Sequence, residues 1–186
     1  MVRLGNFLFH YRNGLFPLAF LLLFCPSPQL FASDWLAAGL GFAVAMTGQL
    51  IRAATIGLAY IIRGGRHRQV YAEDLVTDGL FSHCRNPLYV GNYLVILGLG
   101  LAANSWVFVL VGYPFFFVAY WAIIRAEENF LRGKFGPAYD AYCAKVNRVL
   151  PRLSGLGETM SSMEFKWGRL VVKEYGSTFA WMLGMT

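Results

Sequence analysis

Four apolar stretches constrain the fold of this chain more than any other feature. They cover residues 14–25, 35–62, 88–103 and 106–124. A helix needs about 20 mostly apolar residues to cross a bilayer. Of the 186 residues, 57% are hydrophobic and only 14% are charged, which leaves too little charge to cover a soluble domain of this size. We therefore predict an all-α, polytopic membrane bundle of about four transmembrane helices, followed by a cytosolic or interfacial helical part.

The first apolar stretch, residues 14–25, is open to a second interpretation. It is short, it ends at the turn sequence PSP, and Arg3 and Arg12 precede it, as the basic residues of a secretory signal peptide would. No small-residue cleavage site follows it cleanly. A first transmembrane helix is therefore the preferred prediction.

The distribution of Lys and Arg predicts the orientation, because cytoplasmic loops carry an excess of these residues. The turns 26–34 and 103–105 contain neither. The opposite ends of the apolar stretches carry Arg3, Arg12, Arg63, Arg66, Arg68, Arg85 and the bases from Arg125 onward. We expect an integral protein of a prokaryotic cytoplasmic membrane, with both termini and the functional site facing the cytosol.

Residues 1–153 are expected to form one transmembrane domain, and 154–186 a linker with a final helix. That helix mixes bases with large apolar residues, so it either lies on the membrane surface or spans it. The net charge of +6 does not indicate nucleic-acid binding, since the bases flank apolar segments. The three cysteines lie far apart and predict no metal site.

Polar residues gather where the third apolar stretch begins, in the sequence GLFSHCRNPLYVG. Asn86 followed by Pro87 is a helix start, with Asn as the cap and Pro at the first helical position. A helix N-terminus favours an anion, and Arg85 adds a positive charge beside it. The pattern therefore predicts either a simple helix start or a site for a carboxylate.

Further along, Gly98 and Gly100 allow either close helix packing or room for a flat ligand. Glu127 and Glu128 stand where the fourth stretch ends. Arg125 and Arg132 are helical neighbours of Glu128, so a solvated ion-pair network accounts for it. Glu127 has apolar helical neighbours and is predicted to point inward, where either a base such as Arg148 or the hydroxyls of a ligand must offset its desolvation.

Residues 136–151 predict a short helix with a stripe that includes Tyr139 and Tyr142. Ordinary packing explains the stripe, and an adenine pocket beside Glu127 and Arg148 is the functional alternative. Arg52 lies inside the end of the second apolar stretch. It either snorkels to the interface or points into a cavity.

Five short motifs occur in order over residues 73–153. They are Gly79-Leu80-Phe81, Arg85-Asn86-Pro87-Leu88-Tyr89-Val90-Gly91, Glu127-Glu128, Phe135-Gly136-Pro137-Ala138-Tyr139 and Arg148-Val149-Leu150-Pro151. Together they resemble the isoprenylcysteine carboxyl methyltransferase family, which is related to phospholipid N-methyltransferases. One position departs from the family pattern, because Asn86 stands where the family usually has His. An Asn replaces that His if it only forms hydrogen bonds, but not if it carries a proton.

This resemblance implies an enzyme that takes a methyl group from S-adenosylmethionine and transfers it to a lipophilic acceptor from the bilayer. It implies cofactor contacts by Glu127, which would bind the ribose, and by Asn86 and Tyr89, with clearance at Gly98 and Gly100. The further cofactor-binding candidates are Arg85, Gly91, Glu128, Tyr139 and Tyr142. Arg148 and Arg52 are the candidates for orienting the acceptor.

The expected acceptor is a carboxylate of the isoprenylcysteine type, because a carboxylate needs no general base and no predicted span contains an inward His. The alternative is N-methylation of a phospholipid amine. Two other functions remain open. One is a membrane reductase that uses NADPH, since sterol reductases resemble this fold at one end, and the other is a membrane protein without enzymatic activity.

Overall fold

The computed structural model describes residues 1–58 and 72–184, and these form a bundle of helices with no strand among them. The predicted all-α fold is thus confirmed. The main helices are α1 (Val2–Phe20), α2 (Asp34–Leu58), α3 (Pro87–Ala102), α4 (Tyr113–Phe135), α5 (Pro137–Lys145), α6 (Leu156–Ser162) and α7 (Trp167–Leu183). Short 3₁₀ or π turns precede or extend them at Leu21–Phe24, Gly79–Ser82 and Phe108–Gly112. The basic stretch 63–68, used above for orientation, lies outside the described residues.

Three of the helical segments are long and apolar enough to cross a membrane: Val2–Phe24, Asp34–Leu58 and Phe108–Phe135. The third predicted span is a shorter apolar helix, Pro87–Ala102, which lies among the others. The first helix begins at Val2 instead of residue 14, because Arg is a good helix former and does not end the helix. Its buried residues Gly5, Leu8 and Phe9 pack inside the bundle, which favours a bundle helix over a signal peptide.

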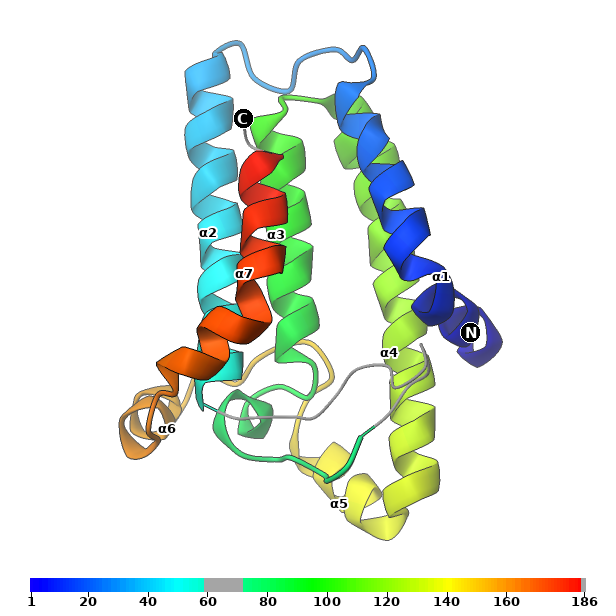
Figure 1. Cartoon of the computed structure of the whole chain (residues 1–186), viewed down its shortest axis with the longest axis vertical. Coiled ribbons are helices and arrows are strands. Elements are labelled where there is room, and N and C mark those ends of the chain that lie inside the picture. The colour runs from blue at the N-terminus through cyan, green and yellow to red at the C-terminus, as the bar shows by residue number, and fades with distance from the viewer. Residues whose placement is uncertain (59–71, 185–186) are drawn as a thin grey trace.

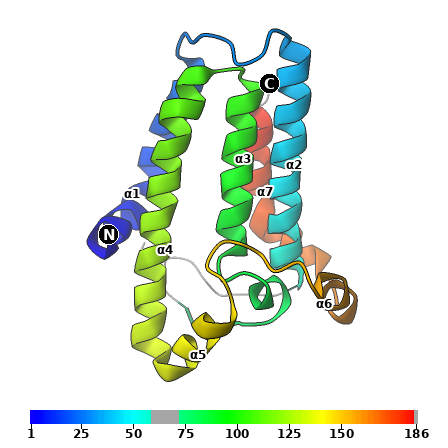
Figure 2. The ribbon, with the colours of Figure 1, turned by 180° about the vertical axis from the view of Figure 1, so that it is seen from behind.

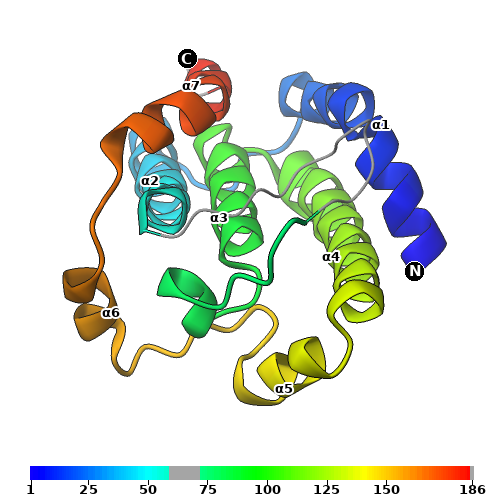
Figure 3. The same ribbon diagram turned by 60° about the horizontal axis from the view of Figure 1, so that its bottom comes forward.

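The bundle has two layers, which Figure 1 shows side by side. In one layer α2 lies along α3, with α7 beside them, and in the other α1 lies along α4. Tyr89 and Tyr93 of α3 pack on Ala119 and Ile123 of α4 and thereby join the layers. Figure 3 looks toward the end of the bundle where α5 and α6 lie. There the segment after α5 lies against the start of α3, where the backbone N–H of Arg85 donates to the carbonyl oxygen of Asn147.

The two helices of the first layer approach closely because glycines face each other. A Cβ atom on Gly41 of α2 would lie 2.5 Å from the carbonyl oxygen of Gly98, and one on Gly48 would lie 2.5 Å from that of Gly91. Small residues at such contacts let the backbones of membrane helices pack together. In the turn after α3, the backbone of Asn104 adopts the left-handed region at φ 50°. The Asn104 side chain forms hydrogen bonds with the backbone of Phe31 and with the carboxylate of Asp34.

Helix α7 packs on α2 through its polar side and exposes its apolar side. Its buried Glu174 pairs with Arg52, while its exposed residues include Val171, Val172, Tyr175, Phe179 and Met182. This arrangement suits a helix that contacts lipid along its length rather than one lying flat on a surface. The C-terminal end of α7 lies near the connection between α1 and α2, at the end away from α5 and α6. The predicted placement of both termini on the cytosolic side stays a prediction.

The close contact between α2 and α3 is testable with two glycines of the same helix. We expect Gly41→Val to lower the melting temperature of the detergent-solubilised protein by several degrees, because its Cβ would meet backbone atoms of α3 that cannot move aside. Gly39→Val is the control, since a Cβ there meets nothing within 4 Å. Equal melting temperatures for the two variants would contradict this packing.

Candidate functional site

The site begins where α3 begins. Pro87 occupies the first helical position, as predicted, but the Asn86 side chain does not cap the helix. Its Nδ2 instead donates to the carbonyl oxygen of Arg148 at 3.1 Å, and the backbone N–H of Arg85 donates to the carbonyl of Asn147 at 2.9 Å. The segment that follows α5 is thereby fastened against the start of α3. The Asn at this position thus has a structural hydrogen bond that requires no proton transfer.

The Glu128 carboxylate is buried between two arginines. Arg148 Nη2 lies 2.8 Å from its Oε2, and Arg85 Nη2 lies 3.2 Å from its Oε1. The prediction of a solvated network with Arg125 and Arg132 is wrong, because Arg132 pairs with Asp140 at the surface. Arg85, whose charge we expected to bind a ligand carboxylate, thus pairs with a carboxylate of the protein itself. Arg148 also stacks on the Trp121 ring, 5.2 Å from its centroid.

Glu127 points inward, as predicted from its apolar helical neighbours. Its side chain is buried, and its Oε1 accepts a hydrogen bond of 2.9 Å from the hydroxyl of Tyr89. Arg148, the base considered for Glu127, pairs with Glu128 instead. The two adjacent carboxylates therefore differ in role: Glu128 joins segments of the protein, and Glu127 faces a cavity.

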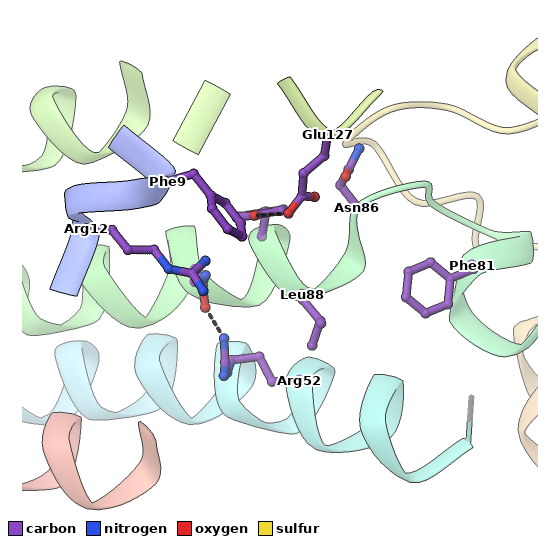
Figure 4. A pocket seen from close by; sticks show the side chains of 9 residues that line it. Phe9, Arg12, Arg52, Phe81, Asn86, Leu88 and Glu127 are labelled. Carbon is purple, nitrogen blue, oxygen red and sulfur yellow. Dashed lines mark hydrogen bonds between the residues drawn. The ribbon is translucent and has the colours of Figure 1, made fainter. Parts of the chain in front are cut away.

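That cavity has a volume of about 200 Å³ and lies in the seam between the two layers. Its lining comes from both layers: Phe9 and Arg12 of α1, Arg52 of α2, Phe81, then Asn86, Leu88, Tyr89 and Asn92 at the start of α3, and Glu127 of α4. Figure 4 shows Arg12 and Arg52 extending from α1 and α2 into the same part of the site, with Glu127 and Asn86 on the other side. The cavity thus offers a carboxylate, two amides and two guanidinium groups.

Arg52 points into the bundle and does not snorkel to its end. Its Nε and Nη2 donate to the two carboxylate oxygens of Glu174 at 3.0 and 2.6 Å, and its Nη1 donates to Asn92. Gly91 makes room for it, because a Cβ there would lie 2.5 Å from Arg52 Cγ. Gln49 Nε2 also donates to Glu174, at 3.2 Å. Arg52 therefore lines the cavity, and its positive charge is balanced by Glu174 of α7.

Gly98 and Gly100 do not line the cavity. A Cβ on Gly98 would meet Gly41 of α2, and one on Gly100 would lie 2.6 Å from the Phe108 ring. The room that we predicted for a ligand beside them is taken up by the protein. Of the alternatives left open by the sequence, close helix packing is therefore the one observed.

Tyr139 and Tyr142 are buried in a cluster with Ala72 and Leu131 and are not among the residues that line the cavity. The Tyr142 hydroxyl donates to the carbonyl of Phe81 at 2.6 Å. Burial, with the negative charge of Glu128 nearby, raises the pKa of Tyr139. Both side chains act in packing, which is the first of the two interpretations of this stripe. Their helix, α5, begins as predicted at Pro137 but ends at Lys145, short of Pro151.

Sequence reasoning missed three side chains that complete the site. Arg12 was placed in a flank, although α1 continues through it and brings it to the cavity. Asn92 had no motif around it. Glu174 follows Lys173 directly, and the available signal was that it is the one carboxylate of α7.

This site, in the seam of a membrane-type helical bundle, defines a polytopic membrane protein with a polar cavity. Comparison with known proteins assigns its family: the phospholipid methyltransferase model matches residues 31–138, more than half of the chain. The chain therefore belongs to the phospholipid methyltransferase family, and the predicted resemblance is confirmed. It is a membrane protein of the methyltransferase class.

Three curated relatives are similar to the chain. The nickel-cobalt-cadmium resistance protein NccN of Alcaligenes xylosoxydans xylosoxydans is 32% identical over 81% of the chain and 70% of its own length. The cobalt-zinc-cadmium resistance protein CzcN of Cupriavidus metallidurans is 35% identical over 81% of the chain and 68% of its length. The protein-S-isoprenylcysteine O-methyltransferase of Schizosaccharomyces pombe is 37% identical over 41% of the chain and 33% of its length. No solved structure matches the chain significantly.

The buried Glu128 pairing predicts a large effect of one conservative change. Glu128→Gln would leave two guanidinium groups uncompensated, so we expect a destabilisation of about 3–5 kcal/mol, or roughly 6 °C or more in melting temperature. Asp140→Asn is the matched control, because it breaks the exposed pair with Arg132 and should leave the melting temperature unchanged. A Glu128→Gln variant as stable as that control would contradict the pairing.

The loop before α3 makes a second prediction, about thiol reactivity. Burial raises the pKa of Cys84 to about 11, so at pH 8 only on the order of one thiol in a thousand is a thiolate. We expect a maleimide to label the exposed Cys25 at pH 8 while Cys84 stays unmodified until the protein unfolds. Mass spectrometry of the labelled peptides checks this, and fast labelling of Cys84 in folded protein would show that the loop is open.

Proposed function

We propose that this protein transfers a methyl group from S-adenosylmethionine to a lipophilic acceptor that reaches the cavity from the bilayer. The observation that carries the proposal is the buried Glu127 carboxylate, oriented by Tyr89 toward a polar cavity in a chain of the methyltransferase class. Polar groups that converge in a pocket of an apolar bundle are costly to bury, and such groups in membrane helices mark functional sites.

The groups that line the cavity fit this methyl donor. S-adenosylmethionine carries ribose hydroxyls and a positive sulfonium, and it supplies an already activated methyl group. Glu127 can accept hydrogen bonds from hydroxyls or face a positive charge, and the Asn92 amide offers further hydrogen bonds. The cavity of about 200 Å³ is smaller than the roughly 300–1,000 Å³ of typical ligand pockets, so it encloses one end of such a molecule.

The protein's contribution to methyl transfer is mainly alignment and exclusion of water. Asn86 and Tyr89 hold the start of α3 and the Glu127 carboxylate in place, and Phe9, Phe81 and Leu88 form an apolar wall. The ion pairs of Glu128 with Arg85 and Arg148 lie outside the cavity lining and hold the segment after α5 against this end of the bundle. We assign them a supporting role instead of direct contact with the donor.

For the acceptor we propose a carboxylate of the isoprenylcysteine type. A carboxylate needs no proton removed before it attacks, and the nine residues that line the cavity include no histidine. The name of the Schizosaccharomyces pombe relative supports this choice. The second candidate is a phospholipid amine, which the description of the matching family favours. We further propose that the cavity end faces the cytosol of a prokaryotic cell, since the bases gather there.

Glu127→Gln tests the proposal. We expect the variant to bind S-adenosylmethionine at least about tenfold more weakly in calorimetry on detergent-purified protein, because the amide loses the charge that the donor faces. Glu158→Gln, on the exposed side of α6, is the matched control and should bind like the unchanged protein.

Three outcomes would count against the proposal. Equal binding by Glu127→Gln and the control would remove Glu127 from the donor site. Binding of NADPH in place of S-adenosylmethionine would favour a reductase. No binding of either by folded protein would favour a membrane protein without enzymatic activity.

A further inference from the structure

Arg12 is a charged residue of α1 that stands just before the apolar stretch 14–25. It lies ten residues into the segment Val2–Phe24, which is long and apolar enough to cross a membrane. Its side chain is half-buried, and it lines the cavity together with Phe9. An ionisable residue within such a segment is costly to keep and is by default a candidate for function.

The contacts of Arg12 within the protein do not balance its charge. Its guanidinium carbon lies 4.3 Å from the centroid of the Phe9 ring, a cation–π contact. Within residues 1–58 and 72–184, no ion pair includes Arg12. A cation–π contact orients a guanidinium but brings no negative charge to it.

The other arginines near this end of the bundle are occupied. Arg52 gives two donors to Glu174 and one to Asn92. Arg85 and Arg148 share Glu128. Among the arginines that the structure describes around the site, Arg12 is thus the one that faces the cavity without a carboxylate partner.

We propose that Arg12 binds a carboxylate of the ligand and that α1 is therefore part of the binding site. The inference rests on the proposed function and adds a specificity-determining residue to it. A guanidinium presents paired donors that match a carboxylate, and its desolvation in the cavity is offset when that anion arrives. The carboxylate belongs either to the methionine part of the donor or to the acceptor, and the experiment separates these two sources.

The matched variants are Arg12→Gln and Arg3→Gln. Both remove one positive charge from α1, but Arg3 is exposed and does not line the cavity. Arg12→Lys keeps the charge and loses the paired donors, and melting temperatures show that each variant is folded. Calorimetry with S-adenosylmethionine and with its decarboxylated analogue tests the donor. Transfer of labelled methyl groups to a bacterial lipid extract tests the acceptor.

If Arg12 holds the donor, Arg12→Gln will bind S-adenosylmethionine at least about tenfold more weakly and will no longer distinguish it from the decarboxylated analogue. If Arg12 holds the acceptor, donor binding will be unchanged, while methyl transfer to the extract will fall at least about tenfold and Arg12→Lys will recover part of it. Either result supports the proposal.

The proposal is overturned if folded Arg12→Gln binds the donor and transfers methyl groups as well as Arg3→Gln does. That result would leave the proposed function intact, because the unchanged protein would still bind S-adenosylmethionine. If the unchanged protein binds no S-adenosylmethionine and transfers no methyl group, the proposed function itself fails, and this inference fails with it.

Discussion

The buried carboxylate of Glu128 holds together three segments that are far apart in the sequence. Through Arg85 it joins α4 to the start of α3, and through Arg148 it joins both to the segment after α5. Loss of this one negative charge would leave two positive charges uncompensated in a largely buried position. The preceding residue of α4, Glu127, meets α3 as well, because its Oε1 accepts a hydrogen bond from the hydroxyl of Tyr89.

The cavity follows from the way in which the two layers pack. Glycines bring the backbones of α2 and α3 into contact, whereas aromatic side chains hold α3 and α4 apart. Large side chains in this seam leave space at one end, and the polar residues of the chain face that space. Helix α7 has the opposite polarity to a surface helix of a soluble protein: the charged Glu174 faces the bundle, and large apolar residues face outward.

Local patterns predicted a good part of this structure. The apolar stretches predicted the helices, Pro87 the start of α3, and the neighbours of Glu127 its inward direction. Patterns along one helix could not predict partners on another. Glu128 was therefore expected to pair with its helical neighbours, and Arg148 was considered as one of two alternatives for balancing Glu127. The sequence allowed either a ligand or a packed helix beside Gly98 and Gly100. In the structure α2 packs against Gly98 and the Phe108 ring against Gly100.

The sequence by itself determined the fold class, the family and the region of the site, because apolar length, capping residues and ordered motifs act over a few residues. The tertiary structure decided which charges balance one another. Arg52 meets Glu174 across 122 positions, and this pairing turns the last helix into part of the bundle. It also decided that Arg12 reaches the cavity. Such contacts depend on the distance and angle between helices, which are set by packing of the whole chain, so a local pattern can mark a charged residue but cannot identify its partner.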